Sequence, residues 1–158
     1  MSGFATADLC DAHDLQVVAP LFRPFGLRAS FFGPVATLKV FEDNTLVRAA
    51  LERPGEGRVL VVDGGGSTRC ALLGDKLATL AIQNQWAGVV LHGCIRDAAV
   101  ISGMNVGIRA IATSPRKSQK RGEGQADVTV SFGGATFRPD DYVYVDADGI
   151  VVAAAALT

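Results

Sequence analysis

Cysteine is scarce in this sequence and is not arranged in pairs. The 158 residues include three cysteines, Cys10, Cys70 and Cys94, and no two of them form a C-x-x-C motif. An odd and widely spaced set argues against a disulfide scaffold and against a structural zinc site. We therefore expect the protein to work in a reducing compartment, which predicts a cytoplasmic location.

The sequence also lacks a long apolar run and an excess of one charge. Its apolar stretches are far shorter than the roughly 18 residues of a membrane span, so we expect no membrane anchor. Fifteen Lys and Arg residues against sixteen Asp and Glu residues give a formal net charge of -1. No overall positive field attracts nucleic acid, and we expect no direct nucleic-acid partner.

No glycine-rich loop of a known nucleotide-binding form is present. Residues 64–68, Gly-Gly-Gly-Ser-Thr, match neither G-x-G-x-x-G nor G-x-x-x-x-G-K-[ST], so we expect a turn there. Residues 146–149, Asp-Ala-Asp-Gly, resemble the start of a calcium loop but lack its later ligand positions. They predict a hairpin turn.

The chain does contain enough apolar material for one core. Hydrophobic residues make up 49% of the 158 residues, which is typical of a single globular domain, and we expect residues 1–158 to form one. In the N-terminal part, residues 6–12 predict a helix capped by Thr6. Residues 35–41 predict a strand, and residues 44–52 predict a second helix.

The middle third predicts a parallel strand-helix-strand unit. Residues 58–63 form a continuous apolar run typical of a strand buried on both faces. Residues 77–84 have helical spacing, and residues 88–92 predict a second buried strand. A right-handed crossover joins such strands. Residues 97–102 predict a short helix, and residues 108–112 predict a further strand.

The C-terminal part reads as antiparallel. Residues 128–152 contain four short strand candidates with turns at residues 133–134 and 148–149, which predicts a meander. The expected fold class is therefore α/β, with a parallel βαβ core and an antiparallel C-terminal layer.

A set of chemically useful residues is expected at one end of the βαβ unit. The helix of about nine residues spans about 13 Å, and the following strand returns about 16 Å. Residues 74–77 and residues 93–97 should therefore lie together at the carboxyl ends of the strands. Free amides at the helix start suit a carboxylate, and Arg96 suits a carboxylate or an enolate. Asp75 and Asp97 suit Mg²⁺ or Mn²⁺, which predicts a 2-oxo acid bound beside a metal.

Three other features have weaker interpretations. His92 and Cys94 flank the glycine before the Arg-Asp pair and are second-rank candidates for the pocket wall. Cys10 and His13 are too few for a metal site and are interpreted as structural. The basic run at residues 116–121 is a solvated loop, a gate for the site, or a contact for an acidic partner.

These residues resemble the signature of a known family. Asp75, the twenty residues before Arg96, and the Arg96-Asp97 pair match the Asp-x20-Arg-Asp pattern of the family named for the regulator of ribonuclease activity A. That family also includes the class II 4-hydroxy-4-methyl-2-oxoglutarate/4-carboxy-4-hydroxy-2-oxoadipate aldolases. The resemblance covers nearly the whole chain, with further matching segments at residues 6–11, 32–34, 115–118 and 146–150.

The resemblance implies a compact, layered β/β/α domain that forms a homotrimer with sites at subunit boundaries. It implies that Asp97 is the direct protein ligand of Mg²⁺ or Mn²⁺, that Asp75 holds a metal-bound or catalytic water, and that Arg96 contacts the substrate carbonyl. The implied substrate-binding residues are Gly74, Asp75, Lys76, Leu77 and Arg96. The longer aldolases add a C-terminal segment with a glutamate, whereas no acidic residue follows Asp148 in this sequence.

The resulting hypothesis is a metal-dependent lyase that cleaves oxaloacetate or another 4-substituted 2-oxo acid, such as 4-hydroxy-4-methyl-2-oxoglutarate, to pyruvate. In this hypothesis Arg96 and the metal stabilise charge on the 2-oxo oxygen, and a water positioned by Asp75 is the base. The alternative is a non-catalytic regulator that binds and inhibits ribonuclease E. A menaquinone methyltransferase is rejected because the sequence lacks the expected glycine-rich cofactor loop.

Overall fold

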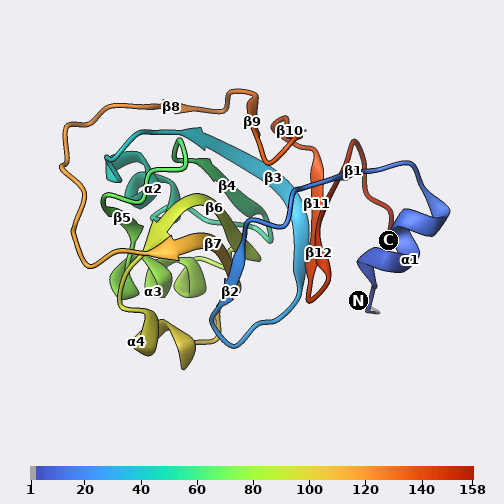
Figure 1. The fold of residues 1–158 in the computed structure, drawn as a ribbon, viewed down its shortest axis with the longest axis horizontal. Helices are drawn as coiled ribbons and strands as arrows, with labels where there is room; N and C mark the ends of the chain where they lie inside the picture. The colour runs from blue at the N-terminus through green and yellow to red at the C-terminus, as the bar shows by residue number, and fades with distance from the viewer. Residues whose placement is uncertain (1–2) are drawn as a thin grey trace.

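A computed structural model describes residues 3–158, and Figure 1 shows how their helices and strands are arranged. The helices are α1 (Thr6–Ala12), α2 (Thr45–Leu51), α3 (Asp75–Gln83) and α4 (Ala98–Ser102). The strands are β1 (Gln16–Val17), β2 (Arg23–Phe25), β3 (Phe31–Lys39), β4 (Val59–Asp63), β5 (Ala71–Leu73), β6 (Gly88–Ile95), β7 (Ile108–Thr113), β8 (Gln125–Ala126), β9 (Val130–Phe132), β10 (Ala135–Phe137), β11 (Tyr142–Asp146) and β12 (Gly149–Ala153).

One mixed sheet organises the described residues. Its strand order is β1-β12-β11-β3-β4-β6-β7-β2, with β5 beside β6 and β8 beside β3. Strands β3, β4, β6 and β7 are parallel neighbours, so the predicted βαβ unit is confirmed. The C-terminal strands β11 and β12 extend the same sheet antiparallel to β3.

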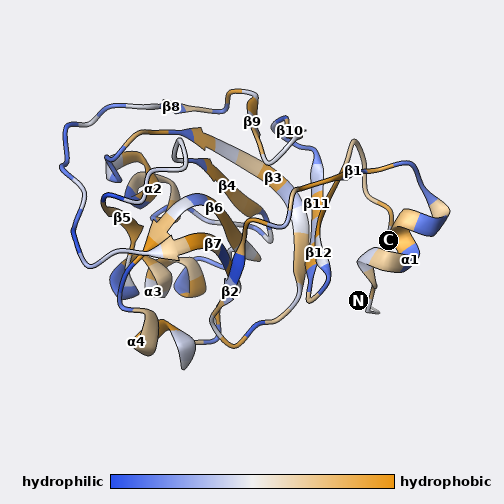
Figure 2. Ribbon diagram, viewed as in Figure 1, coloured by the Kyte–Doolittle hydropathy of each residue, from blue (hydrophilic) through white to orange (hydrophobic). Residues whose placement is uncertain are grey.

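The parallel strands are buried on both faces, which explains why their sequences are continuously apolar. Leu60 and Val62 pack with buried residues of α2, α3 and α4 on one side. Val59 and Val61 face the other side, where the β9–β10 hairpin and the β11–β12 hairpin pack. Apolar residues accordingly concentrate in the central strands in Figure 2. The β/β/α layering expected from the sequence is confirmed.

The C-terminal part forms two hairpins instead of one meander. β9 pairs with β10 in a separate two-stranded sheet, while β11 pairs with β12 and β3. Gly133 and Gly134, with φ values of 59° and 74°, form the first turn as expected, because glycine adopts positive φ without steric cost. The turn expected at residues 148–149 lies one residue earlier, at residues 147–148, because Gly149 already begins β12. The meander prediction fails because β10 and β11 do not pair.

The first helix begins where expected, but Thr6 does not cap it. Ala5 is the N-cap residue, and the Thr6 amide and hydroxyl donate to the Asp146 carboxylate at 2.8 and 2.7 Å. Thr6 therefore ties α1 to β11 and does not satisfy its own helix start. Cys10 and His13 are exposed, so the interpretation that they pack structurally is wrong.

A polar loop, residues 114–124, follows β7 and is held in place by a buried carboxylate. Asp43 accepts hydrogen bonds from the backbone amides of Arg121 (2.8 Å) and Glu123 (3.1 Å). It also accepts from the amide (2.9 Å) and hydroxyl (2.6 Å) of Thr45. Burial alone raises the pKa of Asp43, but these hydrogen bonds outweigh burial and hold the pKa well below its usual range.

The helices of residues 3–158 are short, and α3 has nine residues. None of them combines the length and the apolar character needed to cross a bilayer.

We predict that Asp43→Asn lowers the free energy of unfolding by about 2 kcal/mol at pH 7, because the buried Asp43 side chain loses the charge that strengthens its hydrogen bonds. The folded pKa of Asp43 lies below its unfolded value, so this stabilisation is fully present above the unfolded pKa and is lost as pH falls toward the folded pKa. The difference between wild type and variant should therefore shrink below about pH 4.

Urea denaturation at a series of pH values measures this difference. Asp14→Asn is the matched control, because Asp14 is exposed and makes no side-chain hydrogen bond within residues 3–158. A gap between wild type and Asp43→Asn that stays constant down to about pH 3 contradicts the prediction.

Candidate functional site

Three parallel strands end at the same edge of the sheet. Leu73 of β5 and Thr113 of β7 both pair with Ile95 of β6. The segments that follow these strand ends, residues 74–77, residues 96–97 and the polar loop, consequently lie close together. The first two meet at the carboxyl edge, in agreement with the helix and strand lengths expected from the sequence.

Strand β5 is absent from the strands that the sequence predicts, and the predicted strand over residues 88–92 is too short. Gly93 does not end β6, which continues to Ile95. A Cβ atom at Gly93 would lie 3.2 Å from Leu72 Cδ1, so glycine allows the side chains of β5 to approach closely. Gly93 therefore does not end the strand, and its lack of a side chain makes room for Leu72.

The start of α3 contacts the segment after β6 through a direct hydrogen bond. The Asp75 amide donates to Asp97 Oδ2 at 3.0 Å. Gly74 is the N-cap residue of α3, and a Cβ atom there would lie only 2.7 Å from Asp97 Oδ2. Asp97 has φ 60° and ψ 37°, a left-handed conformation that costs a non-glycine residue about 1–3 kcal/mol. An unusual backbone thus directs the Asp97 carboxylate to the helix start.

This hydrogen bond also favours the charged form of Asp97. The Asp75 N–H is the main influence that holds the pKa of the Asp97 carboxyl below its ordinary value, and burial opposes it. The positive charge of Arg96 lowers the same pKa further. Asp97 is therefore an anion at neutral pH.

The expectation that the amides of residues 74–77 are all free for a ligand needs correction. The Asp75 amide is already used by Asp97. Lys76 and Leu77 lie in the first turn of α3, where amides have no intrahelical partner. These two amides remain for an external anion.

A cavity of about 230 Å³ opens at this edge and brings the sequence-predicted residues together. Its wall contains Gly74, Asp75, Lys76, Leu77, Arg96 and Asp97. It also contains residues that the site prediction did not include: Asn44, Arg48, Ala71, Leu73, Lys117, Ser118 and Lys120.

The sequence indicated some of these additional residues and gave no indication of others. The basic run was one of the features noted in the sequence, and two of its lysines, Lys117 and Lys120, line the cavity. Asn44 had no such signal, because only the folded chain places it there. Its Oδ1 is buried and accepts no hydrogen bond from residues 3–158.

His92 and Cys94, the second-rank candidates, do not line this cavity. Cys94 is fully buried in β6. The His92 ring stacks on Phe132 with 4.9 Å between ring centroids, and its Nδ1 lies 3.9 Å from Asp63 Oδ1. His92 and Cys94 therefore pack against the sheet and do not contribute to the candidate site.

The residues present fit a cation that keeps most of its coordination for water and substrate. Within residues 3–158, no cluster of three or more Cys, His, Asp and Glu side chains forms a complete cage. Asp97 is ionised, and Asp75 lies beside it in the same cavity. Mg²⁺ is held in this way, by one or two carboxylates together with waters and substrate oxygens.

The layered β/β/α fold, with an Arg-Asp pair and a helix start meeting at the carboxyl edge, defines an α/β protein with a candidate site at a strand edge. Residues 6–152 match the model of the RraA-like family, described as Aldolase/RraA. The chain belongs to this family, which confirms the resemblance seen in the sequence.

Individual relatives carry several different names. A protein of Aromatoleum aromaticum with the provisional name 4-hydroxy-4-methyl-2-oxoglutarate aldolase is 56% identical over 98% of both chains. A Geobacillus kaustophilus structure named S-adenosylmethionine:2-dimethylmenaquinone methyltransferase is 54% identical, has a TM-score of 0.94, and matches over 98% of this chain and 97% of its own. The RNA-processing inhibitor RraA from Thermus thermophilis is 42% identical, with a TM-score of 0.96, over 99% of this chain and 96% of its own.

We predict that Gly74→Ala breaks the hydrogen bond between the Asp75 amide and Asp97, because the new methyl group would lie 2.7 Å from Asp97 Oδ2. The pKa of Asp97 should then rise toward its ordinary value, since its main stabilising donor is lost. Carbon-detected NMR titration of the Asp97 carboxyl measures this change.

Gly103→Ala is the matched control, because a Cβ atom there meets only Val100 O at 3.7 Å and the backbone φ is -96°. This control should leave the Asp97 titration unchanged. An Asp97 pKa in Gly74→Ala equal to that of wild type contradicts the prediction.

Proposed function

We propose that this protein is a divalent-metal-dependent lyase that cleaves 4-substituted 2-oxo acids to pyruvate. The proposal covers 4-hydroxy-4-methyl-2-oxoglutarate, the substrate in the name of the aldolase relatives, and the simpler substrate oxaloacetate. The observation that carries it is the meeting of Arg96, Asp97 and the start of α3 in one cavity of about 230 Å³. This set matches the carboxylate, the keto oxygen and the charge balance of a 2-oxo acid.

In the proposed complex the chain holds the 2-oxo acid by its two oxygen-bearing ends. The first-turn amides of Lys76 and Leu77 donate to the substrate carboxylate, as helix starts do for anions. The Arg96 guanidinium, which makes no hydrogen bond within residues 3–158, donates to the 2-oxo oxygen. Negative charge accumulates on this oxygen when the carbon–carbon bond breaks, so Arg96 contributes more in the transition state than in the ground state.

Asp97 is the residue that would hold Mg²⁺ or Mn²⁺, with Asp75 contacting water on the metal. The metal, when bound, supplies Lewis-acid stabilisation of charge on the substrate oxygens. The hydrogen bond from the Asp75 amide orients the Asp97 carboxylate and favours its charged form, which is the form that binds a cation.

Aldol cleavage requires removal of the proton from the 4-hydroxyl group. A water held by Asp75 accepts this proton, the bond between C3 and C4 breaks, and its electron pair moves onto the 2-oxo oxygen as the enolate of pyruvate. Protonation of the enolate at C3 completes the reaction. Oxaloacetate has no 4-hydroxyl proton to lose, so its decarboxylation needs only the stabilised enolate.

Two other functions have less support. Binding and inhibition of ribonuclease E is the alternative raised by the resemblance, and the Thermus neighbour is named as an RNA-processing inhibitor. The methyltransferase name of the Geobacillus neighbour does not suit this chain, because Gly64–Gly66 form a turn that is tied to β6, where the Gly66 amide donates to His92 O at 3.1 Å. The homotrimer and the cytoplasmic location stay predictions of the sequence.

We predict that Arg96→Ala and Asp97→Ala each lower the rate of pyruvate release by about a hundredfold or more, because each removes a group that stabilises developing charge or holds the metal. Pyruvate release from oxaloacetate and from 4-hydroxy-4-methyl-2-oxoglutarate, coupled to lactate dehydrogenase, measures the rate. A chelator should reduce the wild-type rate to that of the variants, and added Mn²⁺ should restore it. Wild-type rates equal to the rate with Mn²⁺ alone contradict the proposed function.

Asp75→Asn separates the two reactions. We predict a loss of about a hundredfold in cleavage of 4-hydroxy-4-methyl-2-oxoglutarate, since the hydroxyl proton loses its route to a base. Oxaloacetate decarboxylation should fall less than about tenfold, because it contains no such step. Arg96→Ala is the matched comparison and should reduce both reactions alike. Equal losses of both reactions in Asp75→Asn show that this residue has no role as a base.

A further inference from the structure

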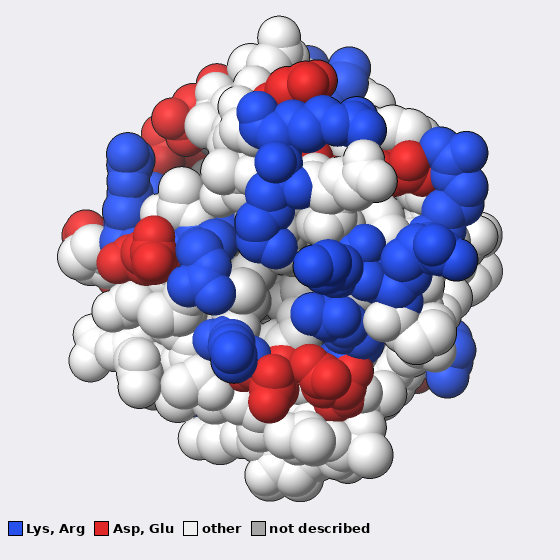
Figure 3. All heavy atoms as spheres, turned by 90° about the vertical axis from the view of Figure 1, so that its left-hand side faces the viewer, with Lys and Arg blue, Asp and Glu red and all other residues white. Residues whose placement is uncertain are grey.

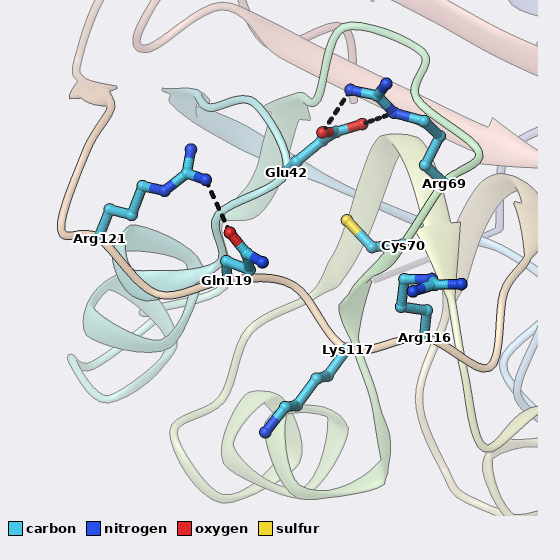
Figure 4. Close-up of a pocket in the computed structure, with 7 residues that line it drawn as sticks. All are labelled: Glu42, Arg69, Cys70, Arg116, Lys117, Gln119 and Arg121. Carbon is cyan, nitrogen blue, oxygen red and sulfur yellow. Dashed lines mark hydrogen bonds and ion pairs between the residues drawn. The ribbon is translucent and has the colours of Figure 1, made fainter.

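A basic face of the molecule does not bring its cations together around one ligand. Figure 3 shows Lys and Arg side chains gathered around a hollow on the face that carries the polar loop. A cavity of about 480 Å³ lies on this face, and Figure 4 shows the side chains that line it. Arg69 there is held by Glu42 through hydrogen bonds of 2.6 and 2.7 Å. Arg116 and Lys117 point in different directions, so the cations do not converge on a common point.

A different cation is buried in the sheet. Arg109 lies on β7 and is only 5% exposed. Its guanidinium donates to three backbone carbonyls, Ala29 O at 2.6 Å, Ile108 O at 3.3 Å and Asp146 O at 3.4 Å. Because a guanidinium has five N–H groups, these three hydrogen bonds leave two N–H groups without an acceptor in residues 3–158.

The charge of Arg109 has no direct partner. No Asp or Glu side chain of residues 3–158 forms an ion pair with it. The Asp146 carboxylate is directed to α1, where it accepts from the amide and hydroxyl of Thr6. Burial lowers the pKa of the Arg109 guanidinium and outweighs the charge of Asp146, which raises it. A buried charge without a partner is unfavourable, so an anion bound beside Arg109 would stabilise the folded protein.

Arg109 lines a cavity of about 530 Å³ whose wall is mainly apolar. The chain between β1 and β2 forms part of this wall as it crosses from one end of the strand order to the other (Figure 1). The apolar side chains of the wall include Val17, Val18, Pro20, Phe22, Pro24 and Ile150. The other charged residues of the wall are Asp146 and the exposed Asp148, in the segment that joins β11 to β12. An apolar cavity with few polar groups is typical of small-molecule sites, which have volumes of about 300–1,000 Å³.

We propose that this cavity binds an apolar monocarboxylate. The ligand carboxylate accepts hydrogen bonds from the unused N–H groups of Arg109 and pairs with its buried charge. The hydrocarbon body of the ligand packs against the apolar wall and leaves water. No residue lines both this cavity and the candidate site, so the inference is independent of the proposed lyase activity.

Octanoate and octanamide test the inference, because they share a hydrocarbon chain and differ in the charge of the head group. Titration calorimetry of the wild-type protein should show at least about tenfold tighter binding of octanoate, as expected for one charged hydrogen-bonded contact. Hexanoate should bind more weakly than octanoate, by about fourfold for each methylene removed. Methyl NMR should show that octanoate shifts the signals of Val18 and Ile150 in the cavity wall and leaves Val100 on α4 unchanged.

Arg109→Met removes the charge and keeps an unbranched apolar side chain. It should lose most of the preference for octanoate while changing the affinity for octanamide less than about threefold, and Arg109→Lys should recover part of the preference. Arg138→Met is the matched control, because it removes an exposed arginine outside the cavity wall. Ala147→Trp fills the cavity from an exposed position of its wall and should weaken both ligands alike. This variant keeps Arg109 and carries the test if circular dichroism shows that Arg109→Met does not fold.

Three results overturn the inference: equal affinities of wild type for octanoate and octanamide, no saturable binding of octanoate, or an octanoate affinity that Ala147→Trp leaves unchanged. Analytical ultracentrifugation of wild type and Arg109→Met tests whether a second copy of the chain covers the cavity instead. A change of oligomeric mass in Arg109→Met, together with no octanoate binding by wild type, assigns the cavity to an interface and also overturns the inference.

Discussion

The hydrogen bond from the Asp75 amide to the Asp97 carboxylate is the contact on which the candidate site depends. It joins the start of α3 to the segment after β6, two parts of the chain that come together only because β5 and β6 are parallel and end at the same level. The contact also requires glycine at position 74 and a left-handed backbone at Asp97. Glycine at the helix start and a left-handed backbone at Asp97 are each unfavourable or neutral by themselves. Together they hold an ionised carboxylate beside the start of α3.

The sequence predicts this convergence for a simple geometric reason. A nine-residue helix and the strand after it have similar lengths, so the chain returns to the edge from which the helix began. Composition and periodicity identify the buried strands β4 and β6 because strands buried on both faces are continuously apolar. The use of the Asp75 amide by Asp97 is beyond such reasoning, since it depends on the side-chain position of a residue in the left-handed region.

Features built from long-range contacts are the ones that sequence patterns miss. Strand β5 has three residues and pairs with β6 through an irregular register, so its short apolar run has no periodicity of its own. The basic run at residues 116–121 is visible in the sequence, but its place depends on Asp43, about 80 residues earlier in the chain, which binds the loop amides at Arg121 and Glu123. A pattern of charges can therefore suggest a gate or a solvated loop, and the fold determines that the loop forms cavity walls.

The one-sided placement of the candidate contacts has a consequence for product release under the proposed function. Cleavage between C3 and C4 places one carboxylate on each product. Only the product formed from the 2-oxo acid end keeps the contacts with the start of α3 and with Arg96, and the other product keeps neither. The other product therefore dissociates first, without any change in the protein.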